Sequence, residues 1–549
     1  MLHSLPPVAL LMLAATSWRE QLDQALFDDT FDGIHALNWF DYSLLIPYFT
    51  LLLILAFYGT HRYEVIWAYL KSRRARKANA PNVAPKQWEQ LPRVTIQLPL
   101  YNERLVVERL LEYAVKVDYP RELLDIQVLD DSTDDTHAFT EALCAEYKAA
   151  GYPVEYIHRT NRYGYKAGAL ENGLKVCKGE FVAVFDADFV IPADFLMKTV
   201  HHFTDPTVGV VQGRWTYLNR YYNLLTEVQG MLLDGHFILE HNGRYRSGLF
   251  FNFNGTAGIL RKSMIQDAGG WEHDTLTEDS DLSYRAQVKG WRFVYCPEVE
   301  CPSELPFDMH GFQVQQARWA KGLTQVAIKL LRRILQTDLP WRVKLEAFSH
   351  LTPNITYPLM ILVTAMMLPV MMVRFYVGWQ QLLLVDLPLL MATFLSVVFF
   401  YIYAQYERDP KSWPRAVLMI PVLMAAGATL TVSNTKAVLE ALMGVQTSFV
   451  RTPKYAITGT QTRESKKAEA VKKYRSKAGW LPWIEFALGS YFLTMCFYAV
   501  DTYNFLAVPL LAVFVAGYYW ASLSTLSREV RDRLAWERAR RLETARVRS

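Results

Sequence analysis

The chain is short of cysteine and of net charge. Its 549 residues include five cysteines and carry a formal net charge of only +4. So small a charge excludes the electrostatic footprint of a nucleic-acid-binding protein. No two cysteines stand in a C-x-x-C pair, which argues against a zinc site. We expect five free thiols in a reducing compartment.

Also absent is a basic residue ahead of the first apolar run, Leu5–Ala15. A secretory signal normally begins with lysine or arginine. We therefore expect a short peripheral or partly inserted helix here, with a cleaved signal peptide as the alternative.

Apolar residues, by contrast, make up 51% of the chain, and five runs are long enough to cross a bilayer. A sixth run, Ala416–Val432, is ambiguous. If it crossed too, the loop Arg451–Lys477 would lie outside although it holds nine Lys or Arg and two Glu. We expect 416–432 to lie along the cytosolic interface instead. The predicted spans are Tyr42–Tyr58 (extending toward Tyr69), Leu351–Val373, Leu382–Ala404, Ile484–Val500 and Phe505–Leu523.

Charge also predicts the orientation of the chain in the bilayer. Basic residues follow the first span and fill the tail, whereas the stretch before that span is acidic. Because basic flanks stay in the cytosol, the N-terminus is expected outside and the C-terminus inside. The predicted parts are an exterior segment (1–41), a first span (42–69), a cytosolic domain with interfacial helices (86–345), two spans (351–404), an interfacial helix and loop (412–479), two spans (484–523) and a basic tail (524–549).

The segment between the first two spans alternates strand and helix patterns. Val94–Pro99, Ile126–Leu129 and Phe181–Phe185 are short apolar runs, each ending in proline or aspartate. Amphipathic segments separate them, as in a parallel α/β sheet. In such sheets ligands bind at the carboxyl ends of the strands.

Four aspartates fall at these strand ends: Asp130, Asp131, Asp186 and Asp188. Two carboxylates at i and i+2 can share one Mg²⁺ or Mn²⁺, which would bridge to a diphosphate. Lys166, in a glycine-flanked turn, would add a cation near the phosphates. The alternative for the aspartates is ordinary helix N-capping.

Two further motifs follow. Thr277-Glu278-Asp279 precedes a helix, and Asp279 is a candidate general base, with helix capping as the alternative. Gln315, Arg318 and Trp319 open a basic amphipathic helix that runs to Leu335. Trp319 offers either a stacking face for a sugar or an interfacial anchor. Asn223–Glu240 is a second candidate interfacial helix.

Together these strings resemble the processive, membrane-embedded members of glycosyltransferase family 2, the cellulose-synthase-like enzymes. The sequences of these motifs are most similar to those of the plant-type A and C groups, which make mannan, glucomannan and the xyloglucan backbone. The resemblance runs from Arg93 to about Lys454. It rests on Gln97–Glu103, Val128–Thr133, Gly164–Ala169, Phe185–Phe189, Phe253–Gly258 and Gln315–Trp319.

The resemblance implies an α/β glycosyltransferase A-type (Rossmann-like) cytosolic domain fused to an α-helical transmembrane domain. It also implies a role for each matching residue. Donor binding falls to Asp130, Asp131, Lys166, Asp186, Asp188, Gln315 and Arg318, with the metal on Asp186 and Asp188 and Asp279 as the base. Acceptor binding falls to Asn254, Gly255, Thr256, Glu278 and Trp319, and a gating loop to Phe449, Thr452 and Lys454. The chain departs from the family's pattern at Pro453, because a proline stiffens a loop that is mobile elsewhere in the family.

We therefore expect a hexosyltransferase that extends a β-linked glycan and passes it through its own helices. β-1,4-Glucan from UDP-glucose is the first expectation, and (gluco)mannan from GDP-mannose the alternative. The other expected partners are the growing polysaccharide and the lipid bilayer, with Mg²⁺ or Mn²⁺ as cofactor and no nucleic acid. Rivals are a single-sugar transferase to a lipid phosphate and a transporter with a nucleotide-binding domain. The sequence does not reveal accessory subunits.

Overall fold

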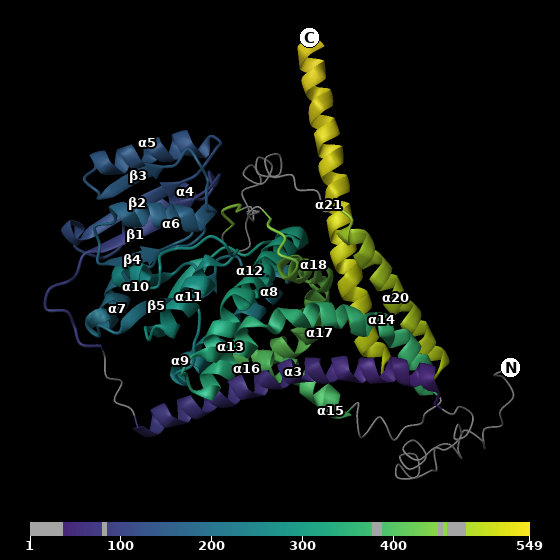
Figure 1. Ribbon diagram of the computed structural model, residues 1–549. Helices are drawn as coiled ribbons and strands as arrows, with labels where there is room; N and C mark the ends of the chain where they lie inside the picture. Colours follow the sequence, from purple (N-terminus) through teal and green to yellow (C-terminus); the bar gives the residue numbers. More distant parts are fainter. Residues whose placement is uncertain (1–36, 80–84, 376–386, 448–453, 458–478, 549) are drawn as a thin grey trace.

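The computed structural model describes residues 37–79, 85–375, 387–447, 454–457 and 479–548. An α/β domain lies at one end and a bundle of long apolar helices at the other (Figure 1). A layer of shorter helices joins the two. This arrangement agrees with the expected glycosyltransferase A-type domain fused to an α-helical membrane domain.

The sheet has seven strands in the order β3-β2-β1-β4-β6-β5-β7. β1 to β4 are parallel, and β5 pairs with β7 in parallel, as the apolar runs predicted. β6 is antiparallel to both of its neighbours, so an all-parallel sheet is wrong at this position. The strands are β1 (Val94–Leu100), β2 (Leu124–Asp130), β3 (Val154–His158), β4 (Phe181–Val184), β5 (Val208–Tyr217), β6 (Gly258–Arg261) and β7 (Arg292–Ser303).

Helices cover the sheet through apolar stripes. In α4 the residues Val107, Leu110, Leu111 and Ala114 recur at the spacing of one helix face, and all four are buried. The main core lies between these helices and the apolar strands. The covering helices are α4 (Val107–Ala114), α5 (Thr136–Ala149), α6 (Tyr165–Val176), α7 (Phe195–Thr199), α10 (Lys262–Asp267) and α11 (Glu278–Val288), with short 3₁₀ turns η1 (Arg121–Leu123) and η2 (Val200–Thr204).

The joining layer contains the two helices that the sequence placed at the interface. The first is split into α8 (Leu224–Asp234), whose Asn223 cap exchanges hydrogen bonds with Thr226, and the π-helix η3 (Gly235–His241). The second is α12 (Met309–Gln336), which begins six residues before Gln315 because Asp308 caps it by accepting from Gly311 N. α9 (Asn242–Arg246) and α13 (Trp341–Leu351) complete the layer.

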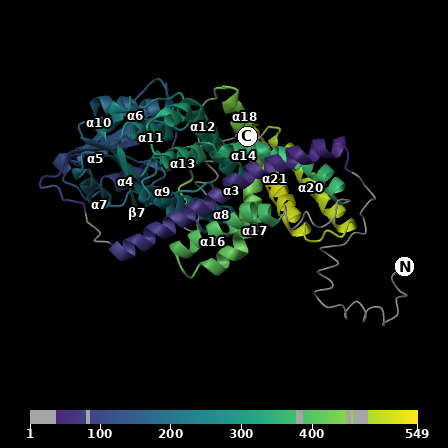
Figure 2. The same cartoon turned by 60° about the horizontal axis from the view of Figure 1, so that its bottom comes forward.

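Within the part of the chain that the structure describes, four helices are long and apolar enough to cross a membrane: Trp39–Arg74, Pro353–Arg374, Leu481–Asp501 and Val508–Arg531. They match four of the five predicted spans. The first, α3, runs from beside α14 at its N-terminal end to beside α9 at its C-terminal end (Figure 2). The longer elements that contain them are α3 (Trp39–Asn79), η4 (Pro353–Ile355) with α14 (Thr356–Phe375), α20 (Leu481–Asp501) and α21 (Val508–Arg548).

The remaining apolar segments are interrupted. The predicted span 382–404 starts outside the described residues and continues as α15 (Leu387–Leu390), the π-helix η6 (Met391–Leu395) and α16 (Ser396–Arg408). The ambiguous run forms α17 (Trp413–Thr429) and α18 (Thr431–Leu442), bent by 40° to each other. Such a pair suits either a broken span or a re-entrant loop, so the interfacial position of 416–432 stays a prediction, as do the orientation and the domain boundaries.

Candidate active site

The carboxyl edge of the sheet opens onto a cavity of about 180 Å³. β1, β2 and β4 end at its rim, as expected for parallel strands. α11 and α12 supply the opposite wall. We call this space the donor cavity, after the donor binding that the sequence predicts for it. The predicted residues that line it are Asp131, Lys166, Asp186, Asp188, Asn254, Gly255, Glu278, Asp279, Gln315, Arg318, Trp319 and Lys454.

Asp130 does not line the donor cavity, although the sequence paired it with Asp131. Successive side chains of a strand point to opposite faces, so only one of two neighbours can face the ligand. Asp130 is fully buried and accepts hydrogen bonds from Ser132 N at 2.8 Å and from the Tyr156 hydroxyl at 2.7 Å. Asp131 faces the cavity and is held by Arg159.

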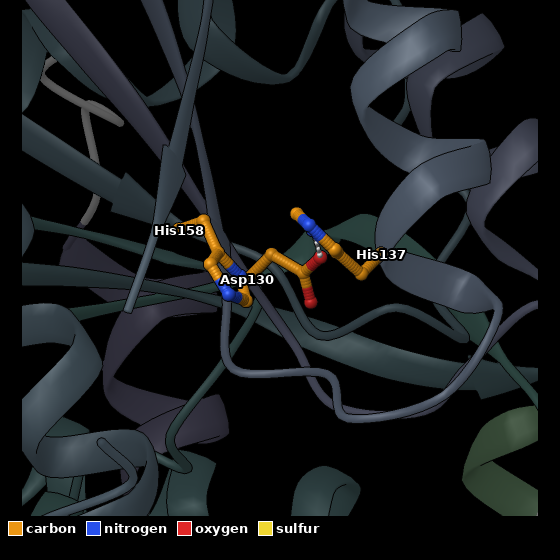
Figure 3. A group of neighbouring side chains, drawn as sticks. All are labelled: Asp130, His137 and His158. Atoms are coloured by element: carbon orange, nitrogen blue, oxygen red, sulfur yellow. Dashed lines mark ion pairs between the residues drawn. The ribbon is translucent and has the colours of Figure 1, made fainter. Parts of the chain in front are cut away.

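Asp130 also lies beside two histidines, His137 and His158 (Figure 3), and their ligand atoms all lie within 4.8 Å of one another. The imidazole rings are stacked, with centroids 4.1 Å apart and planes 25° apart. A ring nitrogen binds a metal along its own ring plane, so stacked rings do not aim at one ion. Tyr156 hydroxyl, hydrogen-bonded to both Asp130 and His137, already lies between them. This geometry fits a hydrogen-bonded support under the strand end better than a metal centre.

Asp186 and Asp188 each hold a lysine. Lys166 Nζ lies 2.5 Å from Asp186 Oδ1, and Lys454 Nζ lies 2.6 Å from Asp188 Oδ2. Both carboxylates line the same cavity, two residues apart, and carboxylate oxygens are what Mg²⁺ and Mn²⁺ prefer. The two carboxylates therefore fit the metal expected from the sequence. Each has a second oxygen besides the one that contacts its lysine, so each can bind a metal and the lysine together.

The loop before β6 shapes the floor of the cavity. Gly255 has a φ of 78°, and a Cβ on it would lie 2.8 Å from Asp279 Oδ2. Only glycine fits here. Thr256 is fully buried beneath the floor, where its Oγ1 accepts from Asp186 N at 2.9 Å. The structure thus places Thr256 as a support for Asp186, outside the lining.

Asp279 sits in the first turn of α11, beside Glu278. Burial and the charge of Glu278 together raise the pKa of Asp279 to about 7, against the opposing charge of Lys166. Burial also raises the pKa of Glu278, against the opposing charges of Lys166 and Arg318. A buried carboxylate with a pKa near neutrality is the form that general-base catalysis requires.

Arg318 and Trp319 face the carboxylates from α12. Burial lowers the pKa of Arg318 below its usual value, although the charges of Glu278 and Asp186 oppose this shift. Trp319 lines the donor cavity and also a second cavity of about 550 Å³. The second cavity extends among α14, α16, α17 and α21. The two cavities share Trp215, Leu233, Asn254, Thr277, Asp279 and Trp319.

Several lining residues had no predicted role. Glu304, in the loop after β7, is buried near Asp188 and accepts from Tyr455 N at 2.9 Å. Burial raises its pKa, against the opposing charge of Lys454. The Arg162 guanidinium stacks over the Tyr101 ring at 3.3 Å. Tyr101 and Arg162 lie in or beside recognisable strings, whereas no local pattern marks Glu304, Trp215 or Tyr217.

Of the three gating-loop residues, Lys454 is described and reaches the donor cavity. Phe449 and Thr452 lie outside the described residues. The predicted gating loop therefore stays a prediction, apart from the contact between Lys454 and Asp188.

Residues 181–378 match the family model "Glycosyl transferase family group 2". The chain is 38% identical over 299 residues to the probable glucomannan 4-beta-mannosyltransferase 3 of Oryza sativa subsp. japonica, covering 51% of this chain and 54% of that protein. It is 41% identical over 250 residues to the glucomannan 4-beta-mannosyltransferase 2 of Arabidopsis thaliana, covering 45% and 47%. The chain thus matches about half the length of these curated relatives.

Among solved structures, the mannosyltransferase PcManGT from Pyrobaculum calidifontis, in complex with GDP-Man and Mn²⁺, has a TM-score of 0.47 and 22% identity. The match covers 72% of this chain and all of that one. The family model covers three of the strings on which the resemblance was based: Phe185–Phe189, Phe253–Gly258 and Gln315–Trp319. Residues 181–378 therefore form a domain of the glycosyltransferase family group 2 type, which is the enzyme class that the resemblance predicted.

Proposed function

We propose that this protein is a processive, inverting hexosyltransferase that extends a β-1,4-linked mannan or glucomannan from GDP-mannose. The observation that carries the proposal is the meeting of the two cavities at Asp279 and Trp319. One cavity has carboxylates and cations suited to a nucleoside diphosphate. The other is long, largely apolar and lined by membrane-type helices, which suits a glycan chain.

In the proposed reaction, a hydroxyl of the acceptor's terminal sugar enters the shared region next to Asp279. Its oxygen attacks the anomeric carbon of the donor while the bond from that carbon to the diphosphate breaks. The hydroxyl proton passes to the Asp279 carboxylate. A single in-line attack inverts the anomeric centre, and the nucleoside diphosphate leaves.

The donor cavity would hold the nucleotide through opposite charge. Asp131 and the Tyr101–Arg162 stack lie at the end of β1 and β2, where the nucleoside would bind. Lys166 and Arg318 would contact the diphosphate, and Gln315 lies one turn before Arg318 on α12. Mg²⁺ or Mn²⁺ on Asp186 and Asp188 would supply charge neutralisation to the leaving group.

Mannose is preferred to the UDP-glucose of our first expectation because of the relatives. The plant proteins that match half of the chain carry names for mannosyl transfer to glucomannan. This favours the GDP-mannose alternative. The orientation with the catalytic domain in the cytosol and the gating role of Lys454 are proposed on the sequence arguments given above.

The test uses purified full-length protein in liposomes, with radiolabelled GDP-mannose and UDP-glucose supplied separately and together. We expect alkali-insoluble label from GDP-mannose, digestible by a β-mannanase and resistant to a cellulase. Linkage analysis should give 4-linked mannose. Polymer formed from UDP-glucose alone would favour the first expectation, a β-1,4-glucan synthase. Label that stays in the organic phase would indicate transfer to a lipid phosphate.

A further inference from the structure

The larger cavity has one polar side. Most of its lining comes from apolar and aromatic residues of the long helices, but Trp215, His236, Glu240 and Asn252 lie together where it approaches Asp279. We call these four residues the polar wall. None of them was assigned a role by the sequence motifs.

The centre of the polar wall is a hydrogen-bonded pair in the π-helix η3. His236 Nδ1 lies 3.0 Å from Glu240 Oε2, and each side chain keeps 27% of its surface exposed. Both line the larger cavity, so this exposure lies toward the interior space. The hydrogen bond from His236 and the charge of Arg244 outweigh burial and hold the pKa of Glu240 well below its usual range. The wall therefore presents a carboxylate to the cavity. π-Helical turns occur often at functional sites.

The wall is joined directly to the shared region of the two cavities. Asn254 Nδ2 donates to His236 Nε2 at 3.4 Å, and Asn254 Oδ1 accepts from Asn252 Nδ2 at 3.0 Å. The Phe237 ring lies 5.1 Å from that of Trp215 and 5.0 Å from that of His236. Because Asn254 and Trp215 line both cavities, the wall starts where the acceptor's terminal sugar would lie.

Two polar atoms of the wall are buried without a hydrogen-bond partner among the described residues: Trp215 Nε1 and Asn252 Oδ1. One is a donor and the other an acceptor. Unpaired buried polar groups are costly, and a ligand with hydroxyls would satisfy both. A hydroxyl donates and accepts, as a pyranose ring does at several positions. A phosphate is unsuited to this wall because Glu240 would repel it.

We propose that the polar wall binds the hydroxyls of an acceptor sugar unit behind the terminal one, with Glu240 as the principal acceptor of hydrogen bonds. The inference rests on the proposed function, since it places a glycan in the larger cavity. It adds a site that holds the chain in register, so that the terminal hydroxyl meets Asp279 after each addition. On the side of α16 and α17 the lining is apolar, so it offers few such contacts and lets the polymer slide; it includes Val397, Phe400, Leu423 and Met424.

The test is acceptor kinetics with the full-length protein in lipid nanodiscs. GDP-mannose is the donor, and β-1,4-linked manno-oligosaccharides of two to six units are the acceptors. Glu240→Gln and His236→Gln should raise the acceptor KM about tenfold to a hundredfold, as expected for loss of a hydrogen bond to a charged group. Trp215→Phe, which keeps a ring but removes Nε1–H, should raise it about two- to tenfold.

Two readouts separate recognition from a damaged fold. Donor KM and hydrolysis of GDP-mannose without acceptor should stay within about twofold of wild type in Glu240→Gln and His236→Gln, whose side chains line only the larger cavity. The preference for the six-unit over the two-unit acceptor should fall, because only the longer acceptor fills the wall. The matched control is His202→Gln, since His202 contacts Cys296 and lines neither cavity.

Unchanged acceptor KM and unchanged length preference in all three variants would overturn the proposal. A parallel loss of donor hydrolysis and polymer formation would also overturn it, because the wall would then only support the fold. A wild-type protein that does not use GDP-mannose would refute the proposed function itself, which is a separate result.

Discussion

Lys454 and Asp188 are 266 residues apart in the chain, yet Lys454 Nζ lies 2.6 Å from Asp188 Oδ2. The same ammonium lies 3.4 Å from the carbonyl oxygen of Glu304. The segment 454–457, which follows α18 in the chain, is thereby tied to the strand end that carries the proposed metal ligands. Through this contact Lys454 becomes part of the lining of the donor cavity.

Replacing Lys454 with methionine should weaken donor binding. The change removes a cation that balances Asp188 and Glu304, so the diphosphate would meet uncompensated negative charge. We expect the KM for GDP-mannose to rise about tenfold, the loss expected for one charge-assisted contact. Lys175→Met, at an exposed position on α6, is the control. An unchanged donor KM would show that Lys454 has no role in donor binding.

Asp279→Asn keeps the size of the side chain and removes its basicity. We expect transfer to fall roughly 10²–10⁴-fold, the usual range for a positioned acid–base group. GDP affinity, measured by calorimetry on the same preparation, should stay near wild type. If Asp279 only caps α11, turnover should remain near normal, because asparagine also caps well.

The pH dependence of the reaction should show an acid limb near pH 7. Burial and the neighbouring Glu278 raise the pKa of Asp279 to about 7, so the proton stays on this carboxyl up to a higher pH than usual. The base form is lost as pH falls through that value, and kcat/KM should drop about tenfold per pH unit below it. Initial rates between pH 5.5 and 9 test this. A limb near pH 4 would contradict it.

Chelation of divalent metal should abolish synthesis. EDTA should stop label incorporation, and added Mn²⁺ or Mg²⁺ should restore it, because Asp186 and Asp188 offer the oxygen ligands that these ions prefer. Asp188→Asn should lose activity while the detergent-solubilised protein keeps its elution volume. Full activity in excess chelator would remove the metal from the proposal.

Reporters should place both basic regions in the cytosol. A fusion after Ser549 and an insertion near Ala468 are both expected to read cytosolic, since lysine and arginine gather at these positions. An exterior reading at 468 would mean that α17 and α18 together cross the membrane. The gating-loop assignment of Phe449, Thr452 and Lys454 would then fail.

The sequence by itself determined the order of the motifs and the type of sheet that presents them. Apolar runs such as Phe181–Val184 have to be buried on both faces, so they predict central strands, and the aspartates that follow fall at the strand ends. Local pattern also located Glu278 and Asp279 at a helix start, as well as four of the apolar helices. These features depend on neighbouring residues, which is why they can be read along the chain.

Tertiary structure alone decided which side chains meet. Asp130 and Asp131 look equivalent in sequence, but strand alternation buries the first against Tyr156 and turns the second into the cavity. β6 was missed because its sequence begins with glycine and ends with arginine, so it lacks the fully apolar run that marked β4. Glu304, Trp215 and the His236–Glu240 pair carry no local signature, since their roles arise from the elements packed around them. Burial and the field of distant charges, such as Lys166 on Asp279, exist only once those elements are in contact.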